Sequence, residues 1–248
     1  MEETGGIKIV EVQIMRIVII NGQNHKGSTR MIARDLAEKV IQRDGGEIRE
    51  FFLPRDFDEP CIGCGTCFRT ELSRCPHHEK LQPITESLEW ADLIILASPV
   101  YVYHATGQMK ALLDHYGTQW MVHRPKECMF HKQSVCVSTA AGAGMKSTNR
   151  DMADSLRFWG VPKIYKMGVA VRAMGPDEIP QKIREKIDRS TDRLADKIVR
   201  NKDPRTPSLN GRIWFHAMRF MHAHVAPMEP DYSYWKERDW DKKNRPWK

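Results

Sequence analysis

The sequence predicts an α/β protein built on a doubly wound, five-stranded parallel sheet, followed by a C-terminal extension. Short apolar runs alternate with amphipathic helical stretches, an order typical of parallel sheets covered by helices on both faces. Polar loops follow several of these runs, at the positions where such sheets bind ligands. The two-half dinucleotide-binding fold is disfavoured, because the sequence shows neither a sixth strand nor a Gly-x-Gly-x-x-Gly motif.

The first part of the domain is predicted as strand, loop, helix and strand. Residues 16–21 form a nearly continuous apolar run, which indicates a strand buried on both faces. A polar loop over 22–29 leads into a helix whose apolar side chains share one face, and Gly45 and Gly46 end that helix. Residues 47–53 form the second predicted strand.

The remaining elements continue the alternation. Further strands are predicted over 92–97, 134–138 and 163–171. Helices are predicted over 108–120, 147–159 and 178–200. Five strands in this order fit the flavodoxin-like sheet, in which ligands bind beyond the carboxyl ends of the strands.

The chain divides into three parts. Residues 15–200 form the flavodoxin-like domain, and residues 1–14 precede it as an N-terminal leader or an extra strand. Residues 201–248 form a basic, aromatic extension, which begins with a linker over 201–210 that holds two prolines and mixed charge.

The composition is that of a globular protein, with 41% hydrophobic and 29% charged residues. The formal net charge is +7, and residues 201–248 hold ten Lys and Arg against six Asp and Glu. Such a balance fits a nucleic acid, a membrane surface or a phosphorylated small molecule as partner. The sequence shows neither a secretory signal nor an apolar run of spanning length, so we expect a cytoplasmic protein without a membrane partner.

The loop over 22–29 has the properties of an anion site. It joins a strand to a helix N-terminus, where free backbone N–H groups and the helix dipole favour negative charge. Ser28 and Thr29 add hydroxyl groups, and His25 and Lys26 add positive potential. The spacing is like that of a nucleotide P-loop, but Ser28 stands in place of its lysine, so a phosphomonoester is favoured over a nucleoside triphosphate. The alternative is a polar turn in which Ser28 or Thr29 caps the helix.

Two further loops follow strands at the same edge of the sheet. The loop after the third strand offers a rigid Pro99 and the aromatic faces of Tyr101 and Tyr103. The loop over 138–144 is rich in small residues, which let a flat ring approach the backbone closely. One phosphate site together with two loops suited to a planar ring predicts a bound mononucleotide.

Three stretches carry a resemblance to a known family: 19–29, 97–101 and 108–114. They are similar to the NADPH-dependent FMN reductase family of flavodoxin-like proteins. The resemblance implies non-covalently bound FMN, NAD(P)H as co-substrate, and a homodimer or homotetramer with the flavin near the subunit interface. Gln23 stands where the family usually has Ser, which weakens a single phosphate contact.

The resemblance also implies which residues bind the cofactor. The FMN phosphate is expected at His25, Gly27, Ser28 and Thr29. The ring is expected against Pro99, Val100, Tyr101, Val102 and Tyr103. The third loop is expected to contribute Thr139, Ala140 and Gly142.

Four of the six cysteines lie within fifteen residues: Cys61, Cys64, Cys67 and Cys75. The first two intervals and the final Cys-Pro pair match ferredoxin motifs, although the last gap is longer. The pattern resembles the iron–sulfur flavoprotein subgroup of the same family, which implies a [4Fe-4S] cluster on these four thiolates. Free or redox-active thiols are the alternative, and zinc is disfavoured because structural zinc sites use two separated ligand pairs.

The other cysteines and several histidines are assigned structural roles. Cys128 and Cys136 are expected to pack as small apolar groups. His77 and His78 are expected to be solvated loop residues, with metal ligation as the lesser alternative. Three histidines of the extension are expected at the surface or at an interface: His216, His222 and His224.

The extension combines basic residues with eight aromatic ones. Four apolar residues recur in it at helical spacing: Trp214, Met218, Met221 and Val225. This spacing predicts an amphipathic helix that packs on the domain or on a partner subunit. The alternatives are a cover over the substrate pocket and a surface for single-stranded nucleic acid.

These observations predict an FMN-dependent oxidoreductase that passes electrons from NAD(P)H to a small-molecule acceptor or a redox protein. The flavin carries the chemistry in such a protein, so no acid–base catalytic residue is assigned. The alternative is an iron–sulfur flavoprotein that acts as an electron carrier without small-molecule turnover. A nucleic-acid-binding module is disfavoured, because only the extension points to it.

Overall fold

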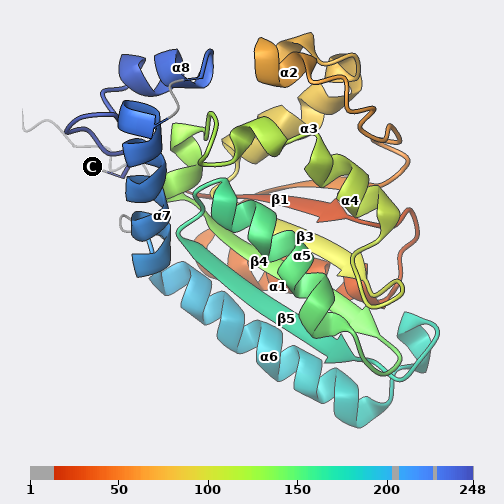
Figure 1. The fold of residues 1–248 in the computed structure, drawn as a ribbon. Coiled ribbons are helices and arrows are strands. Elements are labelled where there is room, and N and C mark those ends of the chain that lie inside the picture. The colour runs from red at the N-terminus through yellow and green to blue at the C-terminus, as the bar shows by residue number, and fades with distance from the viewer. Residues whose placement is uncertain (1–13, 203–206, 226–227, 248) are drawn as a thin grey trace, which may run out of the picture.

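A single parallel sheet forms the centre of the molecule. The structure is a computed structural model, and it describes residues 14–202, 207–225 and 228–247. Five strands lie in the order β2-β1-β3-β4-β5 (Figure 1). Their bounds are β1 Met15–Asn21, β2 Gly46–Phe52, β3 Leu93–Pro99, β4 Gln133–Ala140 and β5 Lys163–Ala170. This order confirms the predicted flavodoxin-like topology.

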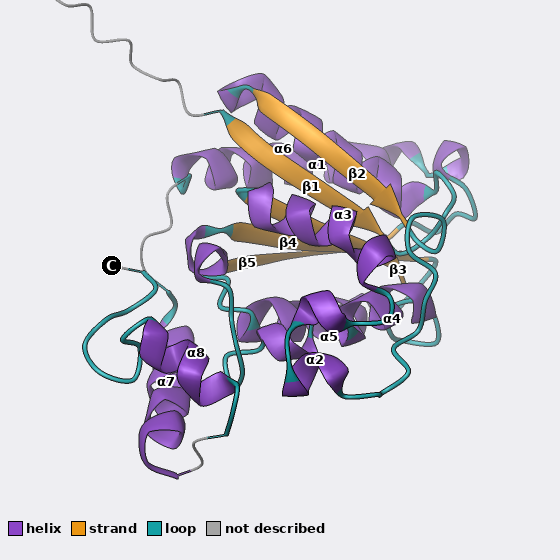
Figure 2. Ribbon diagram, turned by 90° about the horizontal axis from the view of Figure 1, so that it is seen from above, coloured by secondary structure: helices purple, strands orange, loops and turns teal. Residues whose placement is uncertain are grey.

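Helices cover both faces of the sheet (Figure 2). One face carries α1 (Ser28–Asp44) and α6 (Gln181–Arg200). The other carries α3 (His78–Trp90), α4 (Gly107–Asp114) and α5 (Met145–Phe158). The strands explain this arrangement, because alternate residues of β1 are buried in opposite cores: Val18 on the side of α3 to α5, and Ile19 on the side of α1 and α6.

Short helical turns link these elements. They are α2 Thr66–Arg69, η1 Leu72–Arg74, η2 Gly117–Gln119, η3 Glu127–His131 and η4 Pro176–Glu178. The predicted helix over 108–120 is wrong in its second half, because α4 ends at Asp114 and a 3₁₀ turn follows. The predicted start at 178 is likewise too early, since α6 begins after Pro180, which suits the edge of a helix and not its interior.

The sequence analysis did not predict α3. Its signal is present, because Leu81, Ile84 and Leu88 recur at helical spacing and all three are buried. Pro83 obscures this pattern, because it lies inside the helix, where a proline removes one backbone hydrogen bond and is normally disfavoured.

The C-terminal extension packs against the α/β unit through an aromatic core of its own. It contains α7 (Leu209–Phe220), the π-helical turn η5 (Met221–Val225) and α8 (Asp231–Glu237). Phe215, Trp235 and Trp240 are fully buried and cluster with Phe130 and Met121 of the preceding domain. The indole N–H of Trp235 also donates to the carbonyl of His123 at 2.6 Å. The expected packing role is therefore confirmed.

The predicted face of α7 is only partly correct: Met218 packs against the aromatic core, whereas other members of the pattern are exposed. Trp214 is 43% exposed and Val225 is 64% exposed, whereas Phe215 is fully buried at a centroid distance of 6.0 Å from Phe130. His222 is also buried, contrary to its expected surface position, because its ring packs at 4.8 Å from that of Trp235. The large rings of the aromatic core decided the orientation of this helix.

The N-terminal residues and the possibility of a membrane-spanning helix are the last features to compare with the sequence-based expectations. Apart from Ile14, the expected leader or extra strand over 1–14 lies outside the described residues. Among the described helices, none is long and apolar enough to cross a membrane.

Candidate functional site

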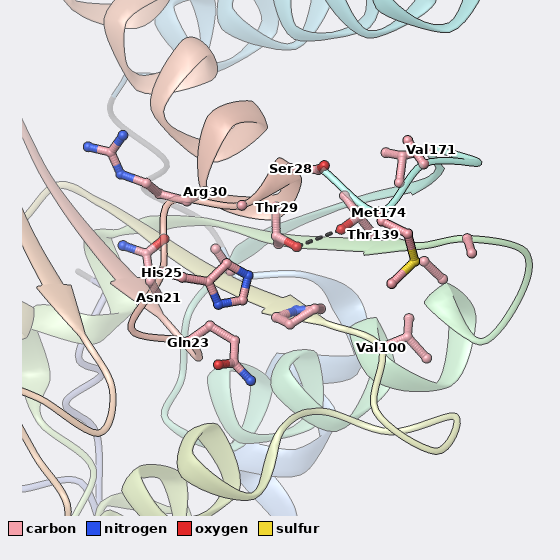
Figure 3. Close-up of a pocket in the computed structure, with 16 residues that line it drawn as sticks. Asn21, Gln23, His25, Ser28, Thr29, Arg30, Val100, Thr139, Val171 and Met174 are labelled. Atoms are coloured by element: carbon pink, nitrogen blue, oxygen red, sulfur yellow. Dashed lines mark hydrogen bonds between the residues drawn. The ribbon is translucent and has the colours of Figure 1, made fainter. Parts of the chain in front are cut away.

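A cavity of about 180 Å³ lies at the carboxyl end of the sheet (Figure 3). It is enclosed by the loops that follow β1, β3, β4 and β5, so four strands contribute to one site. Eight of the predicted cofactor residues line it: His25, Gly27, Ser28, Thr29, Pro99, Val100, Thr139 and Ala140. This is the place where doubly wound sheets bind ligands.

The N-terminus of α1 opens into the cavity. Gly27 is the N-cap residue, and no side chain caps the helix. The alternative in which Ser28 or Thr29 serves as the cap is therefore wrong. A 17-residue helix with an uncapped N-terminus presents backbone N–H groups and a partial positive charge to the cavity, which is the environment that a phosphate prefers.

Two hydroxyl groups join the phosphate loop to the loop after β4. The Oγ1 atoms of Thr29 and Thr139 lie 2.6 Å apart and form a buried hydrogen bond (Figure 3). Ser28 lies beside them and is 8% exposed. The Thr29 and Thr139 hydroxyls are held by each other at the ends of α1 and β4, so the protein fixes this pair without help from a ligand.

Two cavity residues that the sequence analysis did not select are Asn21 and Arg30. The Arg30 guanidinium forms two 3.0 Å hydrogen bonds with the carboxylate of Glu50, which balances its charge. The amide of Asn21 donates to Glu50 at 3.1 Å, while its Oδ1 atom is buried without a hydrogen-bond partner. The signal for Asn21 was its position, since it is the polar last residue of an apolar strand.

Close packing shapes the cavity wall at two glycines. A Cβ atom on Gly27 would lie 2.7 Å from Nε2 of His25. The histidine ring can therefore occupy this position only because Gly27 has no side chain. A Cβ atom on Gly144 would lie 2.5 Å from Val100, and Gly144 also has a positive φ of 96°. The loops after β3 and β4 therefore pack directly on one another.

The remaining predicted ring contacts lie outside the cavity lining. Tyr101, Val102 and Tyr103 form an exposed turn, closed by two 2.9 Å backbone hydrogen bonds between Tyr101 and His104. Val102 and Tyr103 adopt positive φ angles of 48° and 67°, which are unfavourable for a β-branched and a bulky residue. Gly142 also lies outside the lining.

The loop after β5 completes the cavity. Val171, Ala173 and Met174 line it, and none of them was selected from the sequence. Met174 is 92% exposed and stands at the mouth of the cavity (Figure 3). The sequence around these apolar residues did not indicate a ligand site, because only the order of the strands brings the end of β5 to the cavity.

The cysteine segment, residues 61–75, lies between β2 and α3. Cys61 and Cys64 are exposed, and Cys67 and Cys75 are half-buried. Gly63 and Gly65 have positive φ angles of 67° and 68°, which glycine adopts readily and which let the backbone fold tightly around the cysteines.

The thiols of the cysteine segment influence one another. Burial, together with the charges of Cys75, Cys61 and Cys64, raises the pKa of Cys67. Hydrogen bonds from Thr66 lower the pKa of Cys64. Four thiols gathered on one open segment are a donor set that suits iron in an iron–sulfur cluster.

Arg124 connects the cysteine segment to the C-terminal extension. Its guanidinium donates to the carbonyl oxygens of Cys67 at 2.5 Å and Phe68 at 3.3 Å, and also to that of Thr70. The same group forms an ion pair with Asp231 of α8 at 3.1 Å, in which both side chains are nearly buried. Asp231 of the extension therefore positions Arg124, and Arg124 in turn contacts the backbone of the cysteine segment.

The expectation that His77 and His78 are solvated loop residues is wrong. His77 precedes α3 as its N-cap residue and His78 begins the helix, and both are half-buried. Nδ1 of His77 lies 2.9 Å from Nε2 of His115, whose own Nδ1 bonds to the carbonyl of Ala111 at 2.8 Å.

Cys75 joins this histidine pair. The ligand atoms of Cys75, His77 and His115 lie within 4.8 Å of one another, and burial lowers the pKa of His115. His115 is separated from the other two by the whole of α3 and β3, so only the fold reveals the group. As expected, Cys136 is fully buried and Cys128 packs at the edge of the core.

Comparison with known proteins identifies a family and several similar proteins. The sequence pattern of the NADPH-dependent FMN reductase family matches residues 15–174. An iron–sulfur flavoprotein of Archaeoglobus fulgidus is 26% identical over 234 residues, covering 90% of this chain and 99% of that protein. One from Methanosarcina thermophila is 26% identical over 149 residues, covering 59% of this chain and 75% of that protein.

A solved structure shares the fold. An NAD(P)H:quinone oxidoreductase from Methanothermobacter marburgensis matches with a TM-score of 0.54 at 14% identity, covering 73% of this chain and 98% of the other. At this identity the likeness concerns the arrangement of helices and strands.

Proposed function

The chain belongs to the NADPH-dependent FMN reductase family, and we propose that it binds FMN at the carboxyl end of the sheet and passes electrons from NAD(P)H to a small-molecule acceptor or a redox protein. The uncapped N-terminus of α1 carries this proposal, because it faces a cavity in which the buried Oδ1 of Asn21 also lacks a partner. Such groups are normally satisfied by a polar ligand or by ordered water, and an anionic phosphate suits the helix N-terminus.

The residues present fit the phosphate end of FMN. The first backbone N–H groups of α1 point toward the anion, Ser28 and Thr29 supply hydroxyl donors, and His25 closes the loop around it. Arg30 is already paired with Glu50, so its role is to orient Asn21 and the first turn of α1. When bound, FMN supplies the capacity to accept a hydride and to release electrons, while the protein positions it.

The size of the cavity limits which part of FMN it could hold. At about 180 Å³ it is smaller than the roughly 300–1,000 Å³ of typical ligand sites. We propose that it would hold the phosphate end, and that the ring would lie at the rim against Pro99, Val100 and Ala140. A ring in that position is open to NAD(P)H and to an acceptor. We further propose that a second copy in a homodimer or homotetramer covers part of this rim.

We also propose that the cysteine segment holds a [4Fe-4S] cluster through Cys61, Cys64, Cys67 and Cys75. The proposal is supported by the four-thiol donor set, by the two positive-φ glycines and by the relatives named iron–sulfur flavoproteins. The three carbonyl contacts of Arg124 keep the backbone of this segment in place beside the extension. Sulfur ligation by four cysteines is the usual way in which proteins hold such clusters.

An electron carrier without small-molecule turnover is the second candidate function. It is favoured by the exposure of Cys61 and Cys64, which leaves one side of the cysteine segment open to a redox partner. The two candidates differ in the rate at which NAD(P)H is oxidised in the presence of small acceptors.

Anaerobic purification followed by flavin and iron analysis tests both proposals. We expect bound FMN and about four irons per chain, and bleaching of the flavin absorption when NADPH or NADH is added. Multiple turnovers with a quinone or nitro compound identify the oxidoreductase, whereas bound iron with slow nicotinamide oxidation identifies the carrier. A colourless protein that does not bind added FMN contradicts the proposal as a whole.

A further inference from the structure

Helix α6 separates its charges onto two sides. Three of its four acidic residues face α1, where Asp188 pairs with Lys39 at 2.6 Å, whereas Glu185 pairs with Arg189 of α6 itself. One turn and two turns later, Asp192 and Asp196 both pair with Arg43, at 2.5 and 2.7 Å. Every fourth residue of the helix is therefore used to join α6 to α1.

Four basic residues of α6 face a groove between this helix and β5, which lie side by side in Figure 1. The groove has a volume of about 750 Å³ and an apolar floor that includes Val169, Ile183 and Leu194. Six cationic side chains surround the floor: Lys166, Arg172, Lys182, Lys186, Arg193 and Lys197. Neither Asp nor Glu is among the residues that line it.

These six cations have no internal acidic partners. Within residues 14–202, 207–225 and 228–247, none of them forms a described ion pair or side-chain hydrogen bond, although Lys197 lies 5.2 Å from the ring centroid of Tyr165. All six side chains belong to exposed residues. A cluster of like charges on a concave surface raises the local positive potential and attracts an anionic partner.

Two structural features indicate which kind of partner would fit the groove. Among the residues that the structure describes, strand β5 pairs only with β4, so its outer edge offers backbone N–H and C=O groups to a further strand. The groove also adjoins the cavity proposed for FMN: Val171 and Ala173 line the cavity, while Arg172 between them lines the groove. A partner seated in the groove is therefore beside the redox site.

Other occupants fit the groove less well. A second copy of the chain would bring the same cations together in a symmetric contact, and like charges repel. Single-stranded nucleic acid binds through aromatic side chains on which bases stack, and no aromatic residue lines the groove. An extended acidic peptide satisfies both the cations and the free strand edge.

We propose that the groove between β5 and α6 is the docking surface for an extended acidic segment of a redox partner protein. The segment adds a strand along β5, and its carboxylates contact the six cations. The redox role of the partner rests on the proposed flavin function, whereas the binding of the acidic segment does not.

Binding of a fluorescein-labelled peptide of alternating Glu and Val residues tests the proposal by fluorescence anisotropy on the full chain, with and without FMN. We expect saturable binding that weakens as salt increases. Two double variants should each weaken it about tenfold or more: Lys182→Glu/Lys186→Glu and Arg193→Glu/Lys197→Glu. Arg150→Glu/Lys236→Glu is the matched control, because it changes the charge equally at exposed positions outside the groove and should have less effect.

Several results would overturn the docking proposal: equal weakening by the control, undiminished binding by both groove variants, tighter binding of an oligo-dT probe than of the peptide, or displacement of the peptide by NADPH. The last two would assign the groove to nucleic acid or to the nicotinamide substrate. FMN content is measured on each sample, so failure of the flavin proposal is recorded separately from failure of peptide binding.

Discussion

The two ends of the parallel sheet differ in how their polar groups are satisfied. At the amino end, the side chain of Arg16 donates to Asp92 at 2.7 and 3.0 Å and joins β1 to the start of β3. Lys132 is 4% exposed, and its ammonium donates to the backbone carbonyls of Glu89, at 2.8 Å, and Ala91. These groups find their partners inside the protein.

At the carboxyl end, several polar groups lack such partners. The N-terminus of α1 is uncapped, and the buried Oδ1 of Asn21 accepts no hydrogen bond. The cysteine segment follows β2 from the same end and carries four free thiols. The amino end therefore contributes to the stability of the sheet, whereas the carboxyl end leaves polar groups available for the FMN and the cluster proposed above.

The largest effect expected at the carboxyl end comes from Cys64→Ala. Removing one of four thiolates should reduce bound iron from about four per chain to nearly none, while FMN binding is retained, because the flavin cavity shares no residue with the cysteine segment. Iron, sulfide and flavin analyses after anaerobic purification measure this. Cys128→Ala is the matched control, since that thiol packs outside the segment. Full iron content in Cys64→Ala would show that this thiol is not a ligand.

A smaller effect is expected from Thr29→Val. Loss of a hydroxyl beside an anionic phosphate should weaken FMN binding by roughly 10- to 100-fold, since a hydrogen bond to a charged group contributes about 1.5–3 kcal/mol. Quenching of flavin fluorescence gives the affinity. Thr148→Val should leave it unchanged, because Thr148 is equally buried but lies on α5 outside the cavity. Wild-type affinity in Thr29→Val would remove this residue from the phosphate site.

The smallest effect is expected at the amino end, from Asp92→Asn. Burial by itself raises the pKa of Asp92, but the hydrogen bonds and charge of Arg16 outweigh it, so the net pKa lies below its ordinary value of 3.8. The carboxylate therefore contributes stability above pH 3.8, and this contribution is lost as the pH falls through the lowered pKa.

Because the Arg16 side chain is 43% exposed, the contribution is about 1 kcal/mol or less, equivalent to a few degrees in melting temperature. Thermal melts from pH 7 down to pH 3 should show the variant below the wild type at neutral pH and the two curves converging in acid. FMN affinity should not change. An unchanged melting temperature at pH 7 would show that the pair contributes nothing to the sheet.

The parts of the site that could be predicted from sequence are those set by neighbouring residues. The anion loop was recognisable because a strand, a polar turn and a helix follow one another, and the cysteine spacing is likewise local. The contacts of Arg30 with Glu50 and of His77 with His115 were not recognisable, since they join residues that are 20 and 38 positions apart. Arg124 gave no signal for the same reason, because its partners come from α2 and α8.

The sequence by itself determined the alternation of strands and helices, the anion loop after β1 and the four-thiol segment, because periodicity and spacing act over a few residues. Tertiary structure decided which loops share the cavity, which face of α7 is buried, and that α6 turns three aspartates to α1 and four of its cations to the groove beside β5. These features depend on the order of strands and on the packing of large side chains, which join residues distant in the chain.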